Sequence, residues 1–191
     1  MAALMFAAVC AYVGAAFFGG TDFSSETGEP TPQTQTVLYG IALRRESALS
    51  GTLDLPDARR LSVASVSELP DAQTVIYCSG CDGFEHLTPD VLSGMSADAL
   101  EELLEAEPAG NAAGGKFIYG FDWYFAAFLT QGEAPAISTH SRLIFGQNGS
   151  EAKGRLVNII ADSGRTVLVF RILDFSPELL RVRKTQAVII D

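Results

Sequence analysis

Short runs of β-branched and aromatic residues, separated by turn formers, recur along the chain from residue 36 onward. Such runs predict strands, because these side chains pack well on a half-buried pleated surface. The predicted strands are Thr36–Arg44, Leu61–Val66, Thr74–Cys78, Lys116–Thr130, Ser141–Phe145, Arg155–Ala161, Thr166–Ile172 and Val182–Ile190. Arg155–Ala161 and Thr166–Ile172 flank the turn sequence DSGR and form a predicted hairpin. The pattern therefore predicts a mainly β, antiparallel fold.

One segment has helical spacing instead. Thr88-Pro89 is a helix-start signal, because a hydroxyl can cap free amides and proline is tolerated at the first helical position. Ser96 offers a second start, for a helix over Ala97–Glu107 that ends at Pro108. Leu100, Leu103 and Leu104 share one face of that helix. We therefore expect one short amphipathic helix within the β fold.

A glycine-rich stretch, GNAAGG at 110–115, follows this helix and predicts a joint between two parts of the folded region. The division predicted from it is a first subdomain over 36–109, which contains the helix, and a second, nearly all-β subdomain over 110–191. Several short strands at turn-marked spacing indicate a small antiparallel barrel or sandwich for the second.

The N-terminal region is uncharged and apolar from Ala2 to Phe18, close to the roughly 20 residues that a membrane-spanning helix needs. We expect a retained anchor over 1–19 and a Gly/Ser/Thr/Pro-rich tether over 20–35. A secretory signal sequence is the alternative, although no Lys or Arg precedes the run. The first basic residue after it is Arg44, which favours an extracytoplasmic location for the rest and thus a single-pass cell-membrane protein.

Acidic residues outnumber basic ones, and the formal net charge is −10. Proteins that bind nucleic acid along its phosphates need clustered Lys and Arg, and the sequence contains no basic run. Nucleic acid is therefore excluded as an expected partner.

The sharpest local motif is the pair Cys78 and Cys81 in CSGC. A C-x-x-C pair can cycle between dithiol and disulfide, or it can supply two zinc thiolates with His86 as a nearby third ligand. Redox chemistry would require the first cysteine at a helix N-terminus, whereas a loop follows here. The competing interpretation is two small buried hydrophobes or a local disulfide at a strand end, and we favour it.

Aromatic residues alternate through the strand that begins at Lys116. Alternation places Phe117, Tyr119, Phe121 and Trp123 on one side of that strand. Such a row can form an aromatic ligand-binding face, but more often it lies in a core. We predict core packing, and a ligand-binding face remains the alternative.

The segment Asp82–Leu104, DGFEHLTPDVLSGMSADALEELL, resembles HlyD-like membrane fusion (adaptor) proteins of Gram-positive anaerobes. The motif positions are Asp82, Gly83, Phe84, Glu85, Thr88 and Pro89. GIALRRESALSG at 40–51 is similar to the first strand of that family's lipoyl-like (barrel-sandwich hybrid) domain. GKFIYGFDWYFAAFL at 115–129, which contains Trp123, is similar to the strand that opens its β-barrel domain.

The resemblance implies a non-enzymatic adaptor without a cofactor, with a reduced lipoyl-like subdomain over 36–109 and a β-barrel over 110–191. It implies the cell membrane and a transporter permease or envelope protein as partners, and a second copy of the chain is a further candidate. The long helical hairpin of many adaptors is missing, because 51–74 is short and contains Pro56 and Pro70. A thiol-disulfide or zinc protein and an extracytoplasmic ligand-binding domain are the alternatives.

Overall fold

The computed structural model describes residues 36–62, 74–108, 114–129, 137–146, 149–162, 164–174, 179–180 and 182–190. These residues belong to one compact unit, Gln35–Asp191. The predicted anchor over 1–19 and the tether over 20–35 lie outside the described residues. Among the helices that are described, none is both long and apolar enough to cross a membrane.

The fold is mainly β and antiparallel, as predicted, with little helix. The strands are β1 (Thr36–Ala48), β2 (Arg59–Ser62), β3 (Thr74–Cys78), β4 (Lys116–Leu129), β5 (His140–Phe145), β6 (Ser150–Asp162), β7 (Arg165–Ile172) and β8 (Lys184–Ile190). A 3₁₀ helix, η2 (Pro89–Gly94), precedes the α-helix α2 (Ala97–Glu105). The prediction of a mainly β chain with one short α-helix is confirmed in the described residues.

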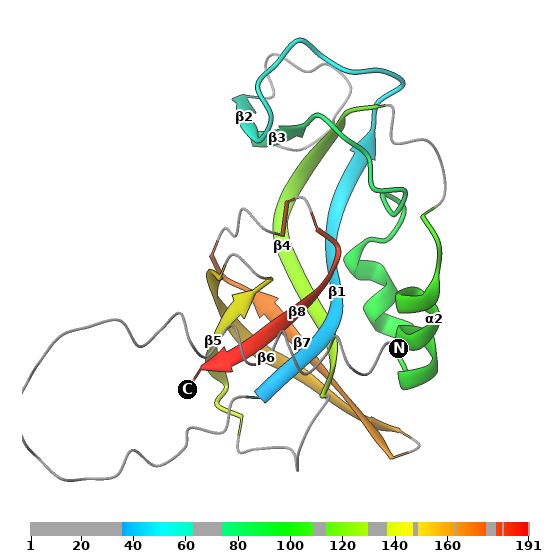
Figure 1. Ribbon diagram of the computed structural model, residues 1–191, viewed down its shortest axis with the longest axis vertical. Helices are drawn as coiled ribbons and strands as arrows, with labels where there is room; N and C mark the ends of the chain where they lie inside the picture. Colours follow the sequence, from blue (N-terminus) through cyan, green and yellow to red (C-terminus); the bar gives the residue numbers. More distant parts are fainter. Residues whose placement is uncertain are drawn as a thin grey trace, which may run out of the picture. The chain divides into compact units, whose positions relative to one another are not determined.

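Six strands close into a ring. β1 pairs with β8, β8 with β5, β5 with β6, β6 with β7 and β7 with β4, and β4 pairs back to β1. β1 and β4 are long and extend beyond the ring as a two-stranded ribbon, and β3 and β2 add to the far end of β4 (Figure 1). The ring thus takes β1 from the predicted 36–109 subdomain and its other five strands from the predicted 110–191 subdomain.

Two apolar clusters lie on the two sides of the ring wall. Its interior is filled by buried side chains that include Phe125, Phe145 and Phe170, and the rings of Phe125 and Phe145 meet edge to face. On the outer side, η2 and α2 pack against β1, β4 and β7, as the position of α2 beside these strands in Figure 1 shows. Leu100 of α2 is fully buried there. Burial on both sides explains why the middle of β7, Val167–Phe170, is an uninterrupted apolar run.

Both predicted helix starts are present. The Ser96 side chain accepts a hydrogen bond from the Ala99 N–H and caps α2, which ends two residues before the predicted Glu107. Thr88 caps Pro89–Gly94 in the same way through the Asp90 N–H, but that segment is 3₁₀ rather than α-helical. Its six residues span too little chain to propagate an α-helix before Ser96 starts the next one.

The aromatic strand departs from the predicted alternation. Gly120 has φ +66° and the β1–β4 register shifts between Leu43 and Arg45, so β4 contains extra residues at this point. Phe117 and Tyr119 pack with Tyr77 of β3, outside the ring of strands, whereas Trp123 packs inside that ring. The prediction that these aromatic residues share one side was therefore wrong for Trp123, because the irregularity between Tyr119 and Trp123 turns Trp123 to the opposite face of the strand.

Candidate functional site

Six charged side chains gather at the end of the ring where the β1–β4 ribbon leaves it. We call Arg44, Glu46, Asp82, Glu85, Lys116 and Arg183 the charge cluster. Arg44 and Glu46 lie on β1, Lys116 opens β4, Arg183 precedes β8, and Asp82 and Glu85 lie in the loop after β3. Elements far apart in sequence thus contribute three basic and three acidic groups, so the cluster is electrically balanced.

Glu46 has a fully buried side chain that contacts all three basic groups. Its Oε1 accepts from Arg44 Nε, and its Oε2 lies 3.1 Å from Lys116 Nζ and 2.5 Å from Arg183 Nη2. A carboxylate buried in this way needs such partners, because an unpaired buried charge costs several kcal/mol (about 3–5 kcal/mol when one partner of a pair is removed). Glu46 is therefore the central anion of the charge cluster.

Lys116 occupies the position that a metal ion would take. Carboxylate oxygens of Glu46, Asp82 and Glu85 lie within 4.8 Å of one another, a grouping that could hold a cation. The ammonium of Lys116 lies 3.1, 2.7 and 3.5 Å from these three carboxylates. Because Arg44 and Arg183 also contact Glu46, the negative charge is already neutralised within the protein. The arrangement fits a structural ion network better than a metal centre.

The two arginines of the charge cluster also bind backbone carbonyls. Arg44 donates to the carbonyl of Leu179 and, at 3.1 Å, to that of Leu180, and the side chains of both leucines are buried in the same apolar cluster as Phe125. Arg183 donates to the carbonyl of Leu87 at 2.9 Å. The charge cluster therefore fixes the segment that closes the ring end and the loop that leads to η2.

The sequence DGFE folds as a compact turn beside the charge cluster. Asp82 accepts a hydrogen bond from the Phe84 N–H at 3.0 Å, and Glu85 accepts one from the Asp82 N–H at 2.7 Å. Gly83 has φ +78°, a conformation that favours glycine. Phe84 is buried against the outer side of the ring of strands. The Lys184 ammonium lies 4.5 Å from the centre of the Phe84 phenyl group. The structure thus gives the motif positions Asp82 to Glu85 a role in folding.

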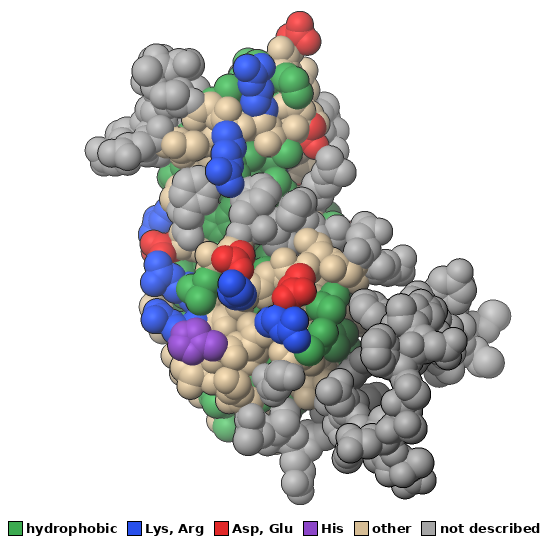
Figure 2. Space-filling view, turned by 90° about the vertical axis from the view of Figure 1, so that its left-hand side faces the viewer, with side chains coloured by type: hydrophobic (Ala, Val, Ile, Leu, Met, Phe, Trp, Pro, Cys, Tyr) green, Lys and Arg blue, Asp and Glu red, His purple; other side chains and the backbone are tan. Residues whose placement is uncertain are grey.

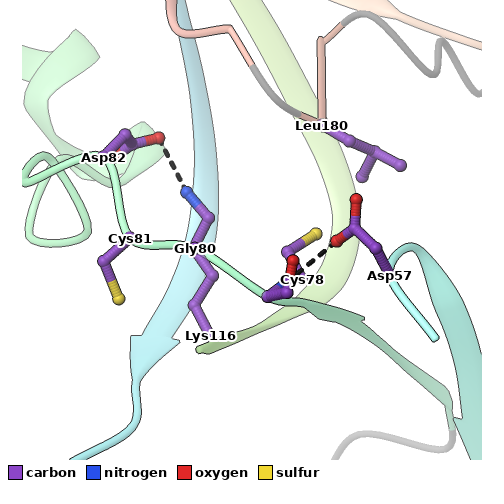
Figure 3. A pocket seen from close by; sticks show the side chains of 8 residues that line it. Asp57, Cys78, Gly80, Cys81, Asp82, Lys116 and Leu180 are labelled. Atoms are coloured by element: carbon purple, nitrogen blue, oxygen red, sulfur yellow. Dashed lines mark hydrogen bonds and ion pairs between the residues drawn. The ribbon is translucent and has the colours of Figure 1, made fainter. Parts of the chain in front are cut away.

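An open pocket of about 240 Å³ lies beside the charge cluster. Its lining consists of Asp57, Cys78, Ser79, Gly80, Cys81, Asp82, Lys116 and Leu180. Figure 3 shows Lys116 reaching across this pocket to Asp82. Asp57 accepts a hydrogen bond from the Ser79 N–H at 2.9 Å, which ties the CSGC loop to the chain before β2. Four of the lining residues are therefore already engaged in pairs, Asp57 with the Ser79 N–H and Asp82 with Lys116.

The two cysteines of this loop are free thiols that point away from each other (Figure 3). Burial raises the pKa of Cys78, and the negative charge of Asp57 adds to this effect. The pKa of Cys81 is raised by partial burial and by Glu85, and its Sγ lies 3.3 Å from the Gly115 carbonyl. A raised pKa keeps a thiol protonated and poorly nucleophilic at neutral pH.

The candidate zinc ligands, which belong to an alternative and not to the favoured interpretation, do not converge in the described part of the chain. His86 is exposed, and Cys78, Cys81 and His86 do not form a group of three with ligand atoms close to one another. Trp123, the remaining motif residue, is buried inside the ring, with the Arg44 guanidinium 6.0 Å from the centre of its indole ring.

Basic and acidic side chains are mixed on the exposed face that Figure 2 shows. The exposed ion pairs of the described part include Arg142 with Glu151 at 3.7 Å and Lys153 with Asp174 at 3.9 Å. Exposed pairs of this kind contribute little stability. The exclusion of nucleic acid as a partner stays a prediction.

Sequence reasoning did not identify Arg44, Glu46, Lys116 and Arg183. The available signal was the pair Arg44 and Glu46, two charged residues at alternate positions directly after the apolar run Ile41–Leu43. No family model matches the chain, and neither a curated protein nor a solved structure matches it. The interpretation of the site therefore depends on its own geometry.

We expect the ionisation of Asp82 to make the stability of the folded protein depend on pH in the acidic range. Burial alone raises the pKa of this carboxyl, but Arg183 and Lys116 outweigh burial and bring the pKa well below its ordinary value of 3.8. The ionised form is therefore the stabilising one. Its contribution is complete above the unfolded-state pKa of about 3.9 and is lost as the pH falls below it.

Unfolding measured from pH 7 down to pH 2 tests this expectation. Asp82→Asn should be less stable than the wild type at pH 7 and should lose less stability on acidification. Asp90→Asn is the matched control, because Asp90 has a mostly exposed side chain paired with the exposed Arg45 at 3.1 Å. It should follow the wild-type curve. Equal acid dependence of Asp82→Asn and the wild type would contradict the assigned role of Asp82.

Proposed function

We propose that this protein is a membrane-anchored, non-enzymatic adaptor or scaffold of the HlyD-like type, which docks on an export or envelope complex. The observation that carries the proposal is the role of the motif residues. Asp82 contacts Lys116 at 2.7 Å and Arg183 at 3.2 Å, and Phe84 packs on the ring. The residues on which the resemblance rests thus hold the loop and helix of the folded unit against the ring.

The chemistry of the charge cluster supports binding over catalysis. A general acid or base needs a titratable group that can reach a substrate and exchange its proton near neutral pH. Glu46 and Lys116 are buried and paired to each other, and Asp82 is held in its charged form by basic neighbours. In this proposal, these groups stabilise the folded unit, and that unit presents the surface to which a partner binds.

In the proposed arrangement, the folded unit forms a compact head that lies near the membrane. A flexible tether over 20–35 would have a root-mean-square end-to-end distance of about 20–24 Å. Without a long helical hairpin, the head would stay close to the bilayer, which suits a local scaffold better than a bridge to a distant channel. In this proposal, the lipoyl-like character belongs to 36–109 and the folded unit is extracytoplasmic.

Two other functions have less support. A thiol-disulfide or zinc protein would use Cys78 and Cys81, whose pKa values are raised and whose sulfur atoms point apart. An extracytoplasmic ligand-binding domain would use the aromatic strand, but Phe117 and Trp123 are buried in separate apolar clusters.

Affinity co-purification from native membranes tests the adaptor proposal. The tagged full-length chain is crosslinked mildly in the cells that produce it, extracted with detergent and purified, and mass spectrometry identifies the proteins it retains. The matched control is a tagged chain of residues 1–35 alone. It identifies the proteins that bind to the anchor and the tether in the absence of the head.

A transporter permease or ATPase retained by the full chain and absent from the control is the expected result for an export adaptor. Retention of wall or division proteins instead would support a local envelope scaffold and contradict the export role. Identical protein sets from the full chain and the control would contradict both, because the folded head would then contribute no binding.

A further inference from the structure

Five basic side chains share one face of the ring wall. Arg142 of β5 lies directly opposite Lys153 of β6. Arg155 of β6 lies directly opposite His140 of β5 on one side and Arg171 of β7 on the other. Directly opposed residues point to the same face of a sheet, and so do residues two apart on one strand. We call His140, Arg142, Lys153, Arg155 and Arg171 the basic face.

The basic face is exposed, and acidic neighbours neutralise it only in part. The side chains of Arg142 and Lys153 are 54% and 70% exposed, and their carboxylate partners lie at 3.7 Å and 3.9 Å. Arg171 pairs with Asp122. Arg155 is exposed as well, and none of the ion pairs between described residues includes it. Four guanidinium or ammonium groups thus meet three carboxylates, which leaves an excess of positive charge.

This arrangement lowers the stability of the sheet. Like charges directly opposite each other on adjacent strands are destabilising. The basic face contains two such pairs, Arg142 with Lys153 and Arg155 with Arg171. The exposed carboxylates recover little of that loss, because exposed ion pairs contribute little to stability. An anionic partner explains a positive face that folding does not require.

The basic face lies beside the point where the proposed tether joins the head. Thr36, the first residue of β1, pairs with Ile189 of β8, and Ile189 pairs on its other side with Leu143 of β5. Adjacent strands are about 4.8 Å apart, so Leu143, the neighbour of Arg142, lies about 10 Å from Thr36. In the proposed arrangement, the tether therefore holds this part of the head nearest the bilayer.

Acidic side chains gather on another part of the head. The exposed acidic residues of α2 are Asp98, Glu101, Glu102 and Glu105. Two of them pair with Arg165 at the start of β7, whereas Arg171 of the basic face lies about 20 Å further along that strand. Near an anionic surface, this separation orients a chain of net charge −10, with the basic face toward the surface and α2 away from it.

We infer that the basic face docks on an anionic bilayer surface, where it binds the phosphate groups of lipids. Guanidinium and ammonium groups form strong, charge-assisted hydrogen bonds with phosphate oxygens, and each basic residue near an anionic bilayer adds to binding. The basic face covers three adjacent strands, about 10 Å across, which fits several neighbouring headgroups better than one small anion. The inference rests on the anchor of the proposed function and adds a defined orientation of the head.

Energy transfer from Trp123, the single tryptophan, to dansyl-labelled lipid measures how close the head lies to the bilayer. Trp123 pairs with Ile172, and Ile172 pairs with Gly154, the residue between Lys153 and Arg155, so the donor lies behind the basic face. The full-length chain is reconstituted in vesicles of phosphatidylcholine, alone or mixed with phosphatidylglycerol. We expect more transfer with phosphatidylglycerol, and the excess should disappear at about 1 M salt, where the Debye length is about 3 Å.

A double charge reversal, Lys153→Glu with Arg155→Glu, tests the basic face directly. The matched control is Arg45→Glu with Arg59→Glu, which changes the net charge equally at two exposed residues outside the basic face. On the phosphatidylglycerol vesicles, the first variant should lower the ratio of docked to undocked heads at least about tenfold. The control variant should leave this ratio within about twofold of the wild type.

Equal transfer with both lipids would overturn the inference, and so would an equal loss in both double variants. Alkaline extraction of the vesicles separates this failure from failure of the proposed function, because an inserted anchor stays with the lipid whatever the head does. Release of the chain would contradict the anchor and, with it, both proposals. Dimers in native mass spectrometry that Lys153→Glu with Arg155→Glu abolishes, without a difference between the lipids, would assign the basic face to a second copy and overturn the inference.

Discussion

Replacing Glu46 with glutamine is expected to lower the free energy of unfolding by about 3–5 kcal/mol, the usual cost of removing one partner from a buried ion pair. The variant keeps the shape of the side chain but removes the charge that faces Arg44, Lys116 and Arg183. These three basic groups would then share the remaining carboxylates of Asp82 and Glu85. Denaturant unfolding of the detergent-solubilised chain, followed by the fluorescence of the single tryptophan, Trp123, measures the change.

Glu101→Gln is the matched control for this substitution. Glu101 pairs with Arg165 at 2.6 Å, but its side chain is 54% exposed. Exposed pairs contribute about 0–1 kcal/mol, so this variant should remain close to the wild type. A loss below about 1 kcal/mol in Glu46→Gln as well would mean that the charge cluster does not hold the ring end together.

The charge cluster could not be predicted from sequence because its members converge only in three dimensions. Arg44 and Arg183 are contributed by opposite ends of the folded region, and Lys116 lies between them in the sequence. Local patterns treat each of these residues as an ordinary surface charge. Only the closure of the ring, through the pairing of β1 with both β4 and β8, brings them to one point.

The local elements were predictable for the opposite reason. β3 matches the predicted Thr74–Cys78, and α2 begins after its Ser96 cap as expected. Strand alternation and helix capping depend on neighbouring residues, so a single sequence contains the information. The pairing of β1 with β4 spans an insertion that holds β2, β3, η2 and α2, and no local pattern indicates it.

The CSGC motif shows that a local pattern leaves the chemistry of its cysteines open. Two cysteines at this spacing suggest redox or zinc function wherever they occur. In this fold, Cys78 ends a buried strand and Cys81 lies in the loop before Asp82, so the two thiols are held apart. Burial raises the pKa values of both thiols, and neighbouring acidic groups, Asp57 for Cys78 and Glu85 for Cys81, add to this effect. The positions of the two cysteines in the fold, and not their spacing in the sequence, therefore determine the reactivity of their thiols.

Trp123→Ala is expected to cost about 3–5 kcal/mol of stability, the usual loss when a buried tryptophan is truncated. The side chain packs inside the ring with Phe125 and Leu179 and lies beside Arg44. Its removal would leave a cavity at the end of the ring that the charge cluster closes. Because the substitution removes the fluorescent probe, far-ultraviolet circular dichroism should follow the unfolding of both proteins.

Tyr39→Ala provides the comparison, since Tyr39 is an aromatic residue on β1 that is 37% exposed. Truncating a partly exposed residue removes less buried area, so the loss should be below about 1–2 kcal/mol. A larger loss for Trp123→Ala would locate this motif aromatic in the core, where it serves folding. Equal small losses would instead support a ligand-binding face on the aromatic strand, because a side chain that contributes little to stability is available to contact a ligand.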